Sequence, residues 1–143
     1  MQLKGWNDNE APLKESVDAL TRLLNKALNL TLLKKKMLFH CSAGIGRTGT
    51  FIALLNMKAR VEMFVSQAAE TEQKSLENFE FSIFSVVRRL REQRWGMVYR
   101  REQYIFIYEY MAKELEALGK QLQQEEQLES WSTWSLLDRL QSD

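Results

Sequence analysis

The stretch FHCSAGIGRTGTF, Phe39–Phe51, contains the only cysteine and the only histidine of the 143-residue chain, side by side. Three of the chain's six glycines, Gly44, Gly46 and Gly49, also lie in it, and Arg47 stands among them. A short apolar run precedes the glycines and a long apolar-rich segment follows them. This arrangement predicts a short strand, a tight loop and a helix that begins in the loop.

The composition is that of a globular protein, with 45% hydrophobic and 27% charged residues and a net charge of +1. The charge balance gives no argument for nucleic-acid or membrane binding. No apolar run approaches the ~20 residues of a membrane span, and the N-terminus lacks a secretory signal core. A single cysteine cannot form an internal disulfide, and no metal-ligand set surrounds it. We therefore expect a cytoplasmic protein without a membrane span, a metal or another cofactor.

Apolar residues at helical spacing predict that helices dominate, with at most two or three short strands. In KKKMLF, residues 34–39, a basic stub is followed by a short apolar run that is the candidate buried strand. A polar joint is expected at 66–75, and a turn is expected around Gly96. The predicted helices are marked by Leu13, Val17, Leu20, Leu24 and Leu28; by residues 48–65; by Leu76, Phe79, Ile83, Val86 and Leu90; and by residues 102–122.

A run of three lysines and a cluster of arginines could suggest a phosphate-backbone interface. Acidic residues are interleaved with the arginines, and no nucleic-acid motif accompanies them. We therefore interpret both as solvated faces and expect no nucleic-acid partner. The residues concerned are Lys34–Lys36, Arg88, Arg89, Arg91, Arg94, Arg100 and Arg101.

The glycine-rich stretch allows three interpretations. Its G-x-G-x-x-G spacing is that of a dinucleotide-binding turn, but a second parallel-sheet unit is absent and Glu62 lies too close for the ribose-binding acid. A purely structural turn explains the glycines but leaves Arg47 unexplained. A phosphate-binding loop explains the glycines, Arg47 and Cys41 together.

In the phosphate-loop interpretation, backbone N–H groups and a helix N-terminus converge on an anion. Arg47 would add a planar pair of donors for two phosphate oxygens. A thiol beside such groups has a pKa of roughly 3.5–7.5 rather than ~8.5. The sequence therefore predicts that Cys41 is a nucleophile lying beneath a bound phosphorus atom.

Three segments resemble the protein tyrosine phosphatase family. HCSAGIGRTGTF is similar to its signature, His-Cys, five residues and then Arg. KGWNDNEAP, residues 4–12, resembles its acid loop, in which Trp-Pro-Asp carries the general acid. LREQRWGMVYRREQYIFIY, residues 90–108, resembles its late glutamine-containing segment and favours the tyrosine-specific branch.

The resemblance covers roughly residues 3–112. It implies an α/β fold, namely the helix-rich C-terminal portion of a cysteine-phosphatase fold with a short strand–phosphate loop–helix core and an incomplete sheet. We expect a catalytic region at residues 1–112, in which the N-terminal half of the family's domain is absent, and a C-terminal helical extension at 113–143.

The resemblance also implies roles for individual side chains. Cys41 would attack phosphorus and form a phosphocysteine, and Asp8 would protonate the leaving phenolate and then activate water. His40 would be buried behind Cys41 and tune it, Thr48 would assist departure of the thiolate, and Gln103 matches the second late glutamine.

The remaining implied residues bind the phosphate of a phosphotyrosine protein or peptide, and no cofactor is implied. Backbone N–H groups along the loop and the Arg47 side chain would hold the phosphate oxygens. These residues are Ser42, Ala43, Gly44, Ile45, Gly46 and Arg47.

Two residues depart from the family pattern. Asn7 replaces the acid-loop proline, and Tyr99 stands where the first late glutamine would position water. These changes and the absent half leave an alternative: a truncated or inactive phosphatase that binds phosphotyrosine or a partner without turnover. A partner could bind through the missing half. In the C-terminal segment, Met111, Leu115, Leu118 and Leu122 form a stripe, which we interpret as a helix that packs back on the domain, with a partner-binding helix at 111–140 as the alternative.

Overall fold

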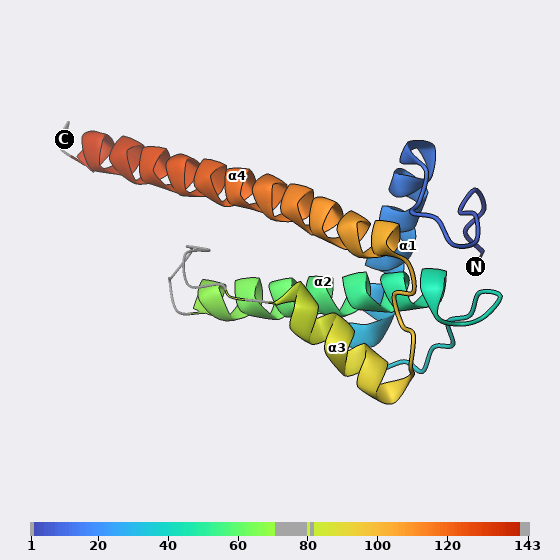
Figure 1. Cartoon of the computed structure of the whole chain (residues 1–143). Helices are drawn as coiled ribbons and strands as arrows, with labels where there is room; N and C mark the ends of the chain where they lie inside the picture. Colours follow the sequence, from blue (N-terminus) through green and yellow to red (C-terminus); the bar gives the residue numbers. More distant parts are fainter. Residues whose placement is uncertain (1, 71–79, 81, 141–143) are drawn as a thin grey trace.

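Four helices form the part of the chain that the computed structural model describes, residues 2–70, 80 and 82–140. Within these ranges, the side chains of 68–70, 126 and 129–140 are not described. The helices are α1 (Lys14–Leu32), α2 (Gly46–Glu70), α3 (Ile83–Gln93) and α4 (Arg101–Leu140). Helix α2 is central, because α1, α3 and α4 all pack against it (Figure 1).

Helix α1 confirms the prediction made from its leucine spacing. Pro12 lies just before the helix, where a missing N–H group costs nothing, and the Ser16 N–H group donates to the Leu13 carbonyl at 2.8 Å. The face that contains Leu20, Leu24 and Leu28 is buried. That face supplies one wall of the core.

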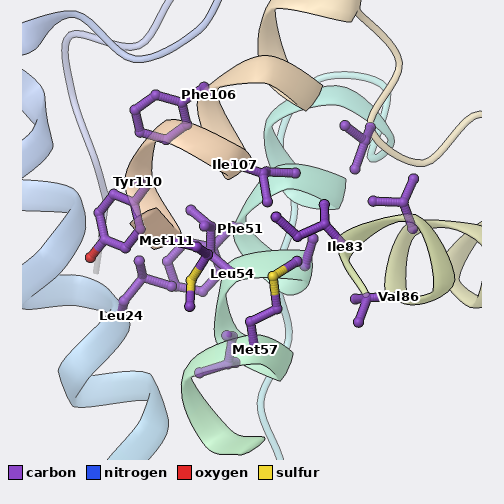
Figure 2. Close-up of a cluster of buried hydrophobic side chains, with 14 of the residues drawn as sticks. Leu24, Phe51, Leu54, Met57, Ile83, Val86, Phe106, Ile107, Tyr110 and Met111 are labelled. Carbon is purple, nitrogen blue, oxygen red and sulfur yellow. The ribbon is translucent and has the colours of Figure 1, made fainter. Parts of the chain in front are cut away.

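The core lies where α2 meets the other three helices (Figure 2). Leu54 and Met57 of α2 are at most 1% exposed, as are Ile107 and Met111 of α4. Burying each such side chain stabilises the fold by roughly 1.5–3 kcal/mol. These contacts hold the first half of α2 in place. The glycine-rich loop leads into the N-terminus of this same half.

Helix α3 begins at Ile83 rather than at the predicted Leu76, and its start is capped by Ser82, whose Oγ accepts from the Ser85 N–H group at 3.2 Å. Leu76 and Phe79 lie outside the described residues. The polar joint predicted at 66–75 was wrong in its first part, because α2 continues to Glu70. Alanine and glutamine favour helix, so polarity alone did not mark its end.

The predicted strand at residues 34–39 is not confirmed. The chain here forms neither helix nor strand, and Leu38 is 88% exposed. A strand exists only through hydrogen bonds to a neighbouring strand, and the described part of the chain offers none. The helix-rich character is therefore confirmed, whereas the sheet is not.

Helix α4 is one continuous helix that includes both the helix predicted at 102–122 and the overlapping C-terminal helix predicted at 111–140. Its first turns pack on α2, and its distal part extends away from α1 (Figure 1). Of the predicted stripe, Met111 is buried, while Leu115, Leu118 and Leu122 are half-buried. No helix among the described residues is long and apolar enough to cross a membrane.

Candidate active site

The glycine-rich loop leads from Cys41 directly into α2, which begins at Gly46. Gly44 has a φ of +72°, a conformation that glycine adopts without strain. Its N–H group points at the thiol and donates to Cys41 Sγ at 3.2 Å. The start of α2 follows directly, and the N–H groups at a helix N-terminus can act as donors for an anion.

Cys41 is half-buried, and the pKa of its thiol lies below its usual range. Burial raises this pKa, but hydrogen bonding from the Thr48 side chain and N–H group and from Gly44, with the charge of Arg47, outweighs it. The Thr48 hydroxyl is buried and makes no hydrogen bond to a described residue, so it is free to donate to a thiolate at Cys41. These groups favour the thiolate form of Cys41.

Arg47 binds the acid loop. Its Nη1 donates to the Trp6 carbonyl at 3.0 Å, and its Nη2 lies 2.7 Å from Asp8 Oδ1. Ser42 Oγ donates to the other Asp8 oxygen at 2.6 Å. A carboxylate is therefore held between the arginine and the start of the phosphate loop.

The segment around Gly96 packs on the back of the loop. The Ile45 carbonyl accepts from the N–H groups of both Gly49 and Val98, at 3.1 and 3.0 Å. A Cβ atom at Gly49 would lie 2.4 Å from the Val98 nitrogen, so only glycine permits this approach. Val98 itself has a φ of +58° and is fully buried. The loop conformation thus depends on a residue held in a strained backbone state.

Gln103 connects the three segments. It is fully buried, and its Nε2 donates to the Glu10 carbonyl at 3.1 Å. Its Oε1 accepts from the Arg100 N–H group at 3.3 Å. A Cβ atom at Gly46 would lie 3.1 Å from Gln103 Nε2. The predicted late glutamine is therefore next to both the acid loop and the phosphate loop.

Two predicted environments were wrong. His40 is exposed rather than buried, because the strand expected to carry it does not form in the described chain. Part of the arginine cluster is not a solvated face. Arg94 donates to the Ala43 carbonyl at 3.1 Å, and Arg91 donates at 2.9 Å to the carbonyls of Met97 and Val98. Both arginines lie in the late segment that resembles the family, and this was the sequence feature that could have predicted their contacts with backbone carbonyls.

These contacts place a thiol at the base of the glycine-rich loop, with Arg47 and the segment that contains Asp8 beside it. Residues 1–113 match the family described as Protein-tyrosine phosphatase. The chain belongs to this family, as its three motif segments suggested.

Several relatives are named as tyrosine-protein phosphatases. The chain is 30% identical over 118 residues to Tyrosine-protein phosphatase non-receptor type 20 of Mus musculus. The aligned residues make up 82% of this chain and 24% of that protein. It is 33% identical over 117 residues to Tyrosine-protein phosphatase 1 of Saccharomyces cerevisiae, and the aligned residues make up 80% of this chain and 34% of that protein. For Tyrosine-protein phosphatase 2 of Schizosaccharomyces pombe, the identity is 36% over 104 residues, which make up 73% of this chain and 13% of that protein. The chain thus spans about a third or less of each relative.

Proposed function

We propose that the chain carries the catalytic loop of a phosphatase that hydrolyses phosphotyrosine in proteins or peptides. The contact between Arg47 and the Asp8 carboxylate carries this proposal. It places an anion on the guanidinium that would hold phosphate, next to a thiol whose pKa is lowered. Carboxylate and phosphate oxygens use the same planar donor pair.

In the first step, the Cys41 thiolate attacks phosphorus, and the bond from phosphorus to the tyrosine oxygen breaks. Arg47 and the loop N–H groups of Ser42–Arg47 hold the three other oxygens and stabilise their charge. Asp8 leaves Arg47, takes up a proton from solvent and donates it to the departing phenolate. The products are tyrosine and a phosphocysteine.

In the second step, water attacks the phosphocysteine and gives up a proton to Asp8. The sulfur–phosphorus bond breaks, phosphate leaves and the thiolate returns. The Thr48 hydroxyl donates to the departing sulfur, which the lowered pKa of Cys41 also favours. Gln103 orients the water, and His40 tunes the sulfur from the residue before it.

We also propose the finer organisation that the family implies. Residues 1–112 would form the catalytic region, and residues 113–143 a helical extension. The apolar end of residues 34–39 would become a strand when neighbouring strands are available. The order of acid loop, phosphate loop and late segment along the chain resembles that of the family, and this resemblance supports the proposed organisation.

Hydrolysis of a phosphotyrosine peptide by the purified chain tests the proposal, with Cys41→Ser as the inactive control. Arg47→Lys keeps the charge but loses the planar donor pair, so turnover should fall by ~10² or more. Arg89→Lys changes an exposed arginine of α3 and should leave turnover unchanged. Equal rates for wild type and Cys41→Ser would refute the proposal.

A second function is favoured by one observation: the phosphate-binding arginine is already occupied by Asp8. A chain in which Asp8 stays on Arg47 would lack its proton donor and turn over slowly, while the loop N–H groups could still hold a phosphate. It would act as a binding module for phosphotyrosine or a partner. Binding of a phosphotyrosine peptide with no release of phosphate would favour this function.

A further inference from the structure

We infer that the end of α1, with the turn that follows it, is a surface that binds an anionic lipid bilayer. This surface, the lysine turn, has six exposed side chains: Leu32, Leu33, Lys34, Lys35, Lys36 and Leu38. The inference goes beyond the proposed phosphatase function and does not depend on it, because adsorption to a bilayer requires no hydrolysis.

The backbone of the lysine turn is held by the hydrogen bonds that end α1. The Lys35 N–H group donates to the Leu30 carbonyl at 2.9 Å, and the Lys34 N–H group donates to the Thr31 carbonyl at 2.9 Å. Lys34 has a φ of +54°, the left-handed conformation that commonly closes a helix. Glycine adopts this conformation with the least strain, so the turn itself gives no reason for a lysine here. The three lysines are therefore presented by a turn of defined shape.

Positive charge is concentrated around the lysine turn in a chain of nearly neutral net charge. The stretch 19–61, between Asp18 and Glu62, contains no acidic residue. Arg22 and Lys26 lie one helical turn apart on the exposed side of α1, and they extend the positive charge from the turn along the helix. None of these basic side chains forms an ion pair with a described residue. Their charges therefore remain available to an external anionic surface.

Exposed leucines distinguish this surface from a solvated basic face. Leu33 is 66% exposed and Leu38 is 88% exposed. Lysines that follow a helix also complement its dipole, but this role leaves the leucines unexplained. In a bilayer interface, leucines leave water, while lysine side chains lie along the apolar layer and keep their ammonium groups among the headgroups. Leucines beside a cluster of lysines are thus typical of a segment that lies in an anionic membrane surface.

Other occupants of this surface fit its chemistry less well. A second copy bound through the same surface would bring lysines against lysines, which repel. A nucleic acid would pair with the lysines but would offer no apolar layer to the leucines. Residues 32–36 precede the apolar end that we propose as a strand, so this part of the surface stays available whether or not that strand forms.

Binding through the lysine turn would hold the phosphate loop close to the bilayer. Cys41 follows Lys36 by five residues, and a fully extended chain of this length spans at most about 18 Å. A chain adsorbed in this way would meet proteins at a membrane surface before proteins in bulk solution.

Co-sedimentation of the full chain with lipid vesicles tests the inference. The chain should bind vesicles of equimolar phosphatidylcholine and phosphatidylserine, and vesicles of phosphatidylcholine alone should bind about 10-fold more weakly or less. Lys35→Glu should weaken binding to the mixed vesicles by about 10-fold or more, because an attraction becomes a repulsion. Lys113→Glu makes the same charge change on an exposed residue of α4, and binding should remain near that of the wild type.

The apolar contribution is tested separately. Leu33→Ser should weaken binding to the mixed vesicles by about 3-fold or more, because less apolar surface leaves water. Leu128→Ser is the matched control, since Leu128 is 70% exposed on α4, and it should have little effect.

Equal binding of the wild type to mixed and to phosphatidylcholine vesicles would overturn the inference. Equal losses in Lys35→Glu and Lys113→Glu, or in Leu33→Ser and Leu128→Ser, would also overturn it. If a single-stranded RNA displaced the chain from the mixed vesicles and bound Leu33→Ser as tightly as the wild type, the surface would be a nucleic-acid site instead.

Discussion

The carboxylate of Asp8 lies 2.7 Å from the guanidinium of Arg47, and the two side chains are 55% and 26% exposed. Both residues were predicted to act on the substrate, one as an acid and the other as the phosphate ligand. In this structure they bind each other instead. In the proposed mechanism, a phosphate group must therefore compete with Asp8 for the same donors before the reaction begins.

Asp8→Asn should bind an oxyanion more tightly than the wild type. Asparagine keeps the shape of the side chain but removes the competing charge. An ion pair this exposed is worth up to about 1 kcal/mol, so vanadate affinity should rise by up to about 5-fold. Protection of Cys41 from alkylation by increasing vanadate reports this affinity. Glu10→Gln is the matched control, because Glu10 accepts from Asn7 rather than Arg47. An unchanged or weaker affinity in Asp8→Asn would contradict the competition.

The alkylation rate of Cys41 should rise with pH and then reach a plateau. The midpoint of this rise should lie below the pKa of a free thiol, ~8.5. The thiolate is the reactive form, and Thr48, Gly44 and Arg47 lower the pKa despite partial burial. Cys41 is the chain's only cysteine, so labelling by iodoacetamide reports it alone.

Thr48→Val should move that midpoint upward, because the variant loses the hydroxyl that favours the thiolate. Thr31→Val serves as the control, since the Thr31 hydroxyl donates to the Ala27 carbonyl within α1. If both variants give the wild-type midpoint, Thr48 does not tune the thiol.

Tyr99→Gln should separate slow hydrolysis from absent catalysis. If Tyr99 removes the water-positioning group, rapid mixing with an aryl phosphate should show a burst of phenol near one equivalent, then slow release of phosphate. The variant should speed the slow phase and keep the burst. Gln103→Ala should make the slow phase slower than in the wild type, because the buried Gln103 amide lies beside both loops. A linear time course without a burst would exclude a role for Tyr99 in slowing hydrolysis.

Gly49→Ala should destabilise the fold and the phosphate loop together. The added Cβ would lie 2.4 Å from the Val98 nitrogen, and backbone must move to make room. Overpacking of this kind costs about 1–3 kcal/mol, which thermal unfolding followed by circular dichroism would detect. Gly119→Ala, within α4, should instead be neutral or stabilising by up to about 1 kcal/mol. Equal melting temperatures for wild type and Gly49→Ala would show that Val98 is free to shift.

Local patterns in the sequence predicted the helices well. Leucine spacing identified α1, and the apolar segment after the glycines identified α2. The strand before Cys41 was not confirmed, because a strand depends on neighbours that a local pattern does not contain. The exposure of His40 follows from the same cause.

The motifs predicted which residues would meet but not which contacts they would make. Cys41, Arg47, Asp8 and Gln103 do converge in space. The pairing of Asp8 with Arg47 was not predicted, because each residue was assigned to the substrate. The close approach of Gly49 to Val98 was also missed, since glycine in a loop is explained equally well by phosphate binding.

The connection of Gln103 to Glu10 spans 93 residues, and that of Arg47 to Trp6 spans 41. Contacts within the helices are local, whereas every segment of the site is joined to another that is distant along the chain. Closing long loops costs entropy before any contact rewards it, so folding favours local structure first. The helices should therefore form before the site closes around Arg47. In pulse-labelling hydrogen exchange, the Val98 amide should gain protection later than amides in the middle of α2, and simultaneous protection would show that the site and helices fold as one unit.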